Sequence, residues 1–82
     1  KTALTVIKNS ELEIKGKGFV SVFSLSDKSE GVTLKNLKYT LDNAELTNTF
    51  PLGLSNEFIN EEVFALIRVQ SGMLLVVINE IA

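Results

Sequence analysis

Apolar and polar residues alternate along much of the chain with the period of two that is typical of β-strands. The sequence Glu-Leu-Glu-Ile-Lys at residues 11–15 places its Leu and Ile on one face of a half-buried strand. Residues 4–7 form a short first segment that stops at the turn signal Asn-Ser at residues 9–10. Residues 19–25 carry apolar residues on both faces, so we expect this strand to be central in its sheet. Two glycines within residues 16–18 predict a bend or bulge before that central strand.

Turn-forming residues divide the middle of the chain. The polar run at residues 26–31 predicts a surface loop that joins two antiparallel strands. The strand expected over residues 32–41 changes phase, because the apolar residues on either side of Asn36 fall on opposite faces, so Asn36 is expected at a bulge or short turn. The pair Asp-Asn at residues 42–43 is expected to end this strand.

The segment that contains the single proline predicts a different kind of structure. Residues 46–54 suggest an irregular crossing connection that places Phe50 and Leu52 against the core. Residues 55–62 leave two alternatives, because Ser55 could cap one helical turn, whereas the Asn-Glu-Glu sequence that ends this segment could equally form a turn.

The strongest strand predictions fall at the C-terminal end. Residues 63–69 and 73–81 are expected to form a hairpin across Gln-Ser-Gly at 70–72, with the glycine supplying a positive φ. Residue types that favour strands (Val, Ile, Thr, Phe, Tyr) number 26 of 82. We therefore expect one all-β domain over residues 1–82, a small antiparallel β-sandwich or jelly-roll-like barrel of about six or seven short strands.

An uncharged apolar run extends from Met73 to Ile78. Such a segment is prone to aggregate when it lies at a sheet edge, so it has to be covered. One of its faces can pack on the core, and the other, with Met73, Leu75 and Val77, needs a second layer or a neighbouring subunit. A homo-oligomer and a monomer in which the strand is simply central remain as alternatives.

Composition removes many kinds of chemistry. The chain has no His, no Cys and no Trp, so it lacks the most frequent general base, the thiol nucleophile and every disulfide. Its serines have no activating partner in a Ser-x-x-Lys motif, and its carboxylates, Glu61 and Glu62 among them, fit a solvated surface better than a calcium or glycosidase site. We expect no enzyme activity, no cofactor and no metal.

Charge is distributed unevenly along the chain. Residues 1–41 contain seven Lys and four acids, a net +3, whereas residues 42–82 contain one Arg and six acids, a net −5. The two halves could be solvated faces that pair across the fold, or complementary surfaces of two subunits. The lysines form no basic stripe and the apolar runs are short, so we expect no nucleic acid partner and no membrane insertion.

Polar loop residues and acids supply two candidate interaction surfaces. Sugar hydroxyls could be bound by amides and carboxylates on predicted loops, and the aromatic ring that sugar sites usually add would have to come from Tyr39, the single Tyr. The loop residues are Asp27, Glu30, Asn43, Asn48, Asn56 and Asn60. A basic protein partner could instead bind an exposed strand edge beside Glu57, Glu61 and Glu62.

The order of elements also resembles a known family. Its layout is similar to that of small β-barrel head modules of bacteriophage tail-fibre and baseplate receptor-binding proteins. The segments that carry the resemblance are the strand at residues 18–25, the chain onward through Leu41, the Phe-Pro connection at 50–51, the Asn-Glu-Phe sequence at 56–58 and a closing apolar hairpin. The resemblance implies a trimer on a virion or cell surface that binds host saccharide. The leading hypothesis is then a non-enzymatic, oligomeric viral or surface appendage module for host or saccharide recognition, and the alternative is a small monomeric regulator or inhibitor.

Overall fold

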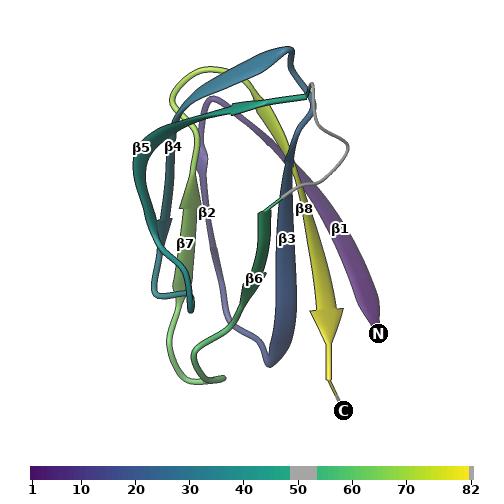
Figure 1. The fold of residues 1–82 in the computed structure, drawn as a ribbon. Coiled ribbons are helices and arrows are strands. Elements are labelled where there is room, and N and C mark those ends of the chain that lie inside the picture. The colour runs from purple at the N-terminus through teal and green to yellow at the C-terminus, as the bar shows by residue number, and fades with distance from the viewer. Residues whose placement is uncertain (49–53, 82) are drawn as a thin grey trace.

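A computed structural model describes residues 1–48 and 54–81, and these form two antiparallel sheets packed face to face (Figure 1). The described residues contain eight strands and no helix. The strands are β1 (Thr2–Lys8), β2 (Glu11–Ile14), β3 (Gly18–Ser24), β4 (Lys28–Lys35), β5 (Leu41–Thr47), β6 (Leu54–Glu57), β7 (Ala65–Arg68) and β8 (Met73–Glu80). The all-β sandwich prediction is confirmed, with eight strands where about six or seven were expected.

The strand order shows that the chain passes repeatedly from one sheet to the other. One sheet has the order β1-β8-β3-β6 and the other has the order β2-β7-β4-β5. At each position, strands that follow one another in sequence occupy the corresponding places of the two sheets. Among the described strands, only β4 and β5 are consecutive in sequence and hydrogen-bonded to each other.

The expected hairpin at the C-terminal end is wrong. β7 pairs with β2 and β4, whereas β8 pairs with β1 and β3, so the two strands lie in different sheets. The segment between them makes no tight turn, because Val69 N–H donates to the Ser10 carbonyl and Gln70 N–H donates to the Glu30 carbonyl. Placing the two apolar strands in opposite sheets gives each sheet an inward face for the other to cover.

Two loop predictions also need correction. The polar run at residues 26–31 joins strands of different sheets rather than a hairpin, and its second half already belongs to β4. Ser29 is fully buried there. Residues 42–43 do not end a strand but lie within β5, where the positive φ of 52° at Asn43 accompanies a shift in the β4–β5 register. Short polar side chains tolerate both environments when hydrogen bonds compensate them.

The chain around residues 55–62 contains a strand and then a turn. β6 occupies the first part, so the helical turn is wrong. In the second part, Val63 N–H donates to the Asn60 carbonyl, and Glu62 N–H donates to Asn60 Oδ1 at 2.9 Å, which is the turn alternative. Phe50 and Leu52 lie outside the described residues.

The core lies between the two sheets. β8 sends Leu74, Val76 and Ile78 inward, and these side chains pack with residues of β3, β4 and β7 in a single cluster. β3 is flanked by β8 and β6, and β8 is flanked by β1 and β3, so neither apolar strand lies at a sheet edge. The prediction that residues 19–25 form a central strand is confirmed, and the uncharged apolar run is covered along both edges.

A change of Val76 to Asp tests the inward face of β8. Val76 is fully buried, so Val76→Asp would place an unpaired carboxylate in the core at a cost of several kcal/mol, on the order of the whole stability of so small a fold. We expect the protein to be unfolded or aggregated by circular dichroism. The control is Val6→Asp on the outer face of β1, which should stay folded, and a folded Val76→Asp protein would contradict this placement.

Candidate functional site

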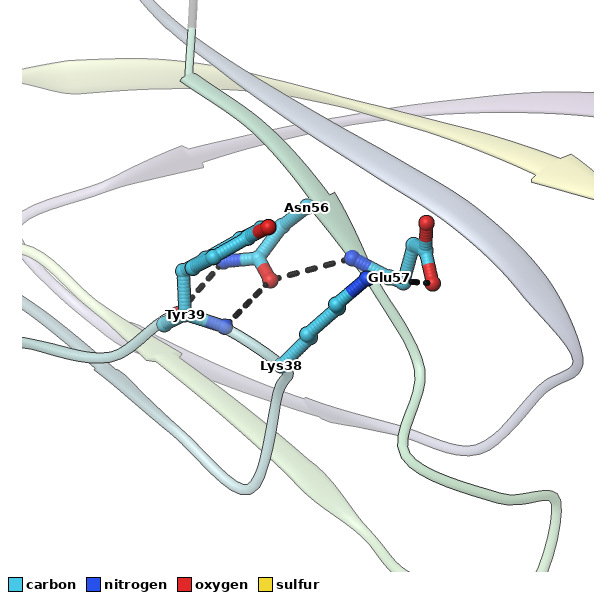
Figure 2. Close-up of polar contacts among 4 residues, drawn as sticks. All are labelled: Lys38, Tyr39, Asn56 and Glu57. Atoms are coloured by element: carbon cyan, nitrogen blue, oxygen red, sulfur yellow. Dashed lines mark hydrogen bonds and ion pairs between the residues drawn. The ribbon is translucent and has the colours of Figure 1, made fainter.

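The connection between β4 and β5 meets the end of β6, and the side chain of Asn56 holds them together (Figure 2). Asn56 Nδ2 donates to the Tyr39 carbonyl at 2.6 Å, and its Oδ1 accepts from Tyr39 N–H at 2.9 Å and from Glu57 N–H at 3.0 Å. The side chain is only 3% exposed. The amide thus replaces the backbone partners that the connection would otherwise lack.

Local sequence explains why the connection follows this path. Asn36 has a positive φ of 60°, which turns the chain out of β4. The next residue, Leu37, is buried and bridges to Phe58 beyond the end of β6. Lys38 N–H donates to the Glu57 carbonyl at 2.9 Å. The prediction of a short turn at Asn36 is confirmed.

The exposed side of this junction carries an aromatic ring and two opposite charges. Tyr39 is 61% exposed. Lys38 Nζ lies 3.7 Å from Glu57 Oε2 and 5.5 Å from the centroid of the Tyr39 ring. The register of β3 and β6 sets the half-exposed Phe19 beside Glu57. An aromatic face next to a carboxylate can bind an organic cation through cation–π and charge attraction.

Of the residues expected at the two interaction surfaces, the structure brings together Tyr39, Asn56 and Glu57. Asn43 lies apart in β5, where its N–H donates to Thr33 Oγ1 at 3.2 Å. Glu61 and Glu62 are exposed in the turn between β6 and β7.

Sequence reasoning missed two members of this junction, Lys38 and Phe19. The signal for Phe19 was the alternation within β3, which sets it on the face opposite the buried Val20 and Val22. The partnership of Lys38 with Glu57 had no local signal, because 19 positions separate the two residues.

A second exposed region is apolar and lies on the outer face of the sheet that contains β8. Met73, Leu75 and Val77 are half-buried on this face. The register of β1 and β8 places Leu4 opposite Val77 and Val6 opposite Leu75, and Leu4 and Val6 are 66% and 53% exposed. Leu4, Val6, Leu75 and Val77 therefore form a continuous outer patch on two adjacent strands.

Within residues 1–48 and 54–81, no three His, Cys, Asp or Glu side chains gather closely enough to hold a metal ion. The same residues include no helix of the length and apolar character that a bilayer crossing requires.

The fold is that of a small β-sandwich domain, and the Tyr39 junction gives it a polar and aromatic surface at one place. A family model described as the vitamin B1 binding domain of thiamin pyrophosphokinase matches residues 5–74. The chain belongs to this family. No curated protein matches it.

Solved structures have the same fold. Thiamin pyrophosphokinase from Geobacillus thermodenitrificans superposes with a TM-score of 0.83 at 24% identity, over 93% of this chain and 36% of that one. The enzyme from Bacillus subtilis gives a TM-score of 0.83 at 23% identity, over 99% and 38% of the two chains. A family member from Enterococcus faecalis gives a TM-score of 0.76 at 22% identity, over 99% and 38%. The chain thus spans less than two fifths of the length of these neighbours.

These matches correct the functional expectations. The resemblance to phage tail-fibre and baseplate head modules is wrong, and the viral or surface appendage, receptor-binding and saccharide-recognition roles fall with it. The regulator or inhibitor alternative is wrong for the same reason. The expectation of no enzyme activity is also contradicted, since the matched family is described as a domain of thiamin pyrophosphokinase. A layout of short strands, loops and one proline is shared by many β-sandwiches, so it carried no functional information.

Replacing Asn56 with Ala tests the junction. Asn56→Ala would leave Tyr39 N–H and C=O without these partners, so we expect the free energy of unfolding to fall by about 1–3 kcal/mol. Urea denaturation measures this loss, and hydrogen exchange should quicken at the Tyr39 amide. The matched control is Asn48→Ala, because Asn48 makes one exposed side-chain bond, to Asp27 at 3.3 Å. Equal stability of the two variants would contradict the role assigned to Asn56.

Proposed function

We propose that this chain recognises thiamin and serves as the vitamin-binding part of a thiamin pyrophosphokinase. The observation that carries the proposal is the match of the family model to residues 5–74, which include the Tyr39 junction. Because the chain spans only 36–38% of the solved pyrophosphokinases, we assign it binding of the vitamin rather than transfer of the pyrophosphoryl group.

The chemistry of the Tyr39 junction supports this assignment. Thiamin joins a positively charged thiazolium ring to a flat aminopyrimidine. A Tyr ring attracts a cation over its face, and a carboxylate nearby adds charge attraction. Tyr39 offers such a ring, Glu57 offers the carboxylate, and Phe19 lies beside Glu57 on the neighbouring strand. We therefore place the thiamin contact at these three side chains.

Isothermal titration of the protein with thiamin tests the proposal. We expect Tyr39→Ala and Glu57→Gln each to weaken binding about tenfold, because each removes one attraction for the cation, worth roughly 1–2 kcal/mol. Both changes should leave the fold intact, since the Tyr39 and Glu57 contacts with Asn56 use backbone groups.

The matched control is Glu30→Gln, which removes the acid of another exposed ion pair, Lys28–Glu30 at 3.5 Å. This control should bind thiamin as the wild type does. Wild-type protein that shows no thiamin binding would overturn the proposed function. Thiamin binding that neither Tyr39→Ala nor Glu57→Gln affects would move the contact to another surface.

We also propose that a second copy of the chain covers the outer patch formed by Leu4, Val6, Leu75 and Val77. The four side chains are contiguous through the β1–β8 register, and two of them are more than half exposed. Thr2 and Asn79 at one end of the patch and Lys8 at the other flank it with polar groups, as polar residues at the rim of protein interfaces do. Two such faces can stack as sheets do, about 10 Å apart.

Sedimentation over a dilution series tests this self-association. Wild-type protein should show a dimer that dissociates on dilution, and Val6→Lys should be monomeric, because it places a charge at the centre of the patch. Ile59→Lys, an exposed apolar position in the turn after β6, should leave the dimer intact. A wild-type monomer at every concentration would contradict the proposal.

A further inference from the structure

The backbone of Lys38 is held in place, whereas its ammonium group is only weakly held. The backbone N–H of Lys38 donates to the Glu57 carbonyl at 2.9 Å, and Asn56 binds both backbone groups of the next residue, Tyr39. Its ammonium group, by contrast, makes one ion pair at 3.7 Å, and the side chain is 53% exposed. The backbone therefore holds Lys38 in place, while its charged group is exposed enough to move into solvent.

The Lys38 ammonium lies where an organic cation would be attracted. It is the cation that the structure places both beside the Glu57 carboxylate, at 3.7 Å, and over the Tyr39 ring, at 5.5 Å. A ligand cation that uses the same carboxylate and the same ring has to take the place of this ammonium. The chain thus contains an internal competitor for the proposed site.

We infer that Lys38 determines the affinity and selectivity of the Tyr39 junction by competing with the cationic ring of the ligand for Glu57 and Tyr39. This inference rests on the proposed function. It predicts that a positively charged ligand binds more weakly than the ring and carboxylate alone would allow. A neutral pyrimidine that does not need Glu57 meets only the competition for the Tyr39 ring, so Lys38 weakens its binding less.

The size of the effect follows from the exposure of the pair. Exposed ion pairs contribute little to stability, because water and salt screen them and side-chain freedom is lost. Displacing Lys38 should therefore reduce thiamin affinity only about two- to fivefold. Arginine would compete more strongly, because its planar guanidinium can bind a carboxylate through two nitrogens and stack on an aromatic ring.

Titration of three variants with thiamin tests the inference. Lys38→Gln should bind thiamin about two- to fivefold more tightly than wild type, and Lys38→Arg should bind it more weakly although its charge is unchanged. General repulsion of the cation by positive charge would leave Lys38→Arg equal to wild type, so this variant separates direct competition from a long-range field. The matched control is Lys28→Gln, which removes a lysine from the Lys28–Glu30 pair and should have no effect.

The outcomes separate the inference from the proposal beneath it. If wild-type protein binds thiamin and Lys38→Gln binds it equally or more weakly, the role of Lys38 is overturned and the proposed function stands. If Lys38→Arg binds as tightly as wild type, direct competition is overturned in the same way. If neither wild type nor Lys38→Gln binds thiamin, both the proposed function and the inference are overturned.

Discussion

The fold depends on hydrogen bonds at one end of the sandwich. They join the three connections at which the chain passes from one sheet to the other, namely β1–β2, β3–β4 and β7–β8. Gly72, with a φ of 122°, lies between them, and a Cβ there would come within 2.6 Å of Ser29 Oγ and 2.9 Å of Ser29 Cα. Asn9 N–H donates to the Gly72 carbonyl, and the Asn9 side chain accepts from Gly72 N–H at 2.8 Å. Leu25 N–H and Ser29 Oγ both donate to the Met73 carbonyl. Each connection therefore supplies hydrogen-bond partners for another, and these bonds hold the two sheets together at this end.

This constraint explains which parts of the fold the sequence could predict. The period of two in residues 11–15 and 19–25 reports burial of one strand face or both, and the strands were found from it. The same pattern contains nothing about which strand lies next to which. The glycine at position 72 indicated a positive φ correctly, but the φ serves a crossing where a hairpin was expected. Pairing is decided by contacts between Ser10, Glu30 and the 69–72 segment, which lie far apart in sequence.

The candidate site likewise contains residues that the sequence could indicate and a residue whose role it could not. Tyr39 and Glu57 were selected from residue type alone, since an aromatic ring and a carboxylate suit recognition when they are exposed. Asn56 was found for the wrong reason: it was expected on a loop that contacts sugar, and the structure buries it in β6 with its amide turned to the chain itself. An Asn in a sequence carries no indication of whether its amide satisfies a ligand or a neighbouring backbone, because both uses need the same donors and acceptors.

At the junction, the groups that hold the backbone differ from the groups that a ligand could contact, because Asn56 is buried and the charged side chains are exposed. Three hydrogen bonds fix the backbone of Tyr39 and Glu57, so the positions from which the ring and the carboxylate project are set before any ligand arrives. The charged groups themselves remain exposed and weakly paired, with 53% of the Lys38 side chain and 42% of the Glu57 side chain accessible. A surface built in this way can exchange one cation for another without disturbing the strands beneath it. Under the proposed function, the exposed pair would select among cations, whereas the buried amide holds the junction beneath it in place.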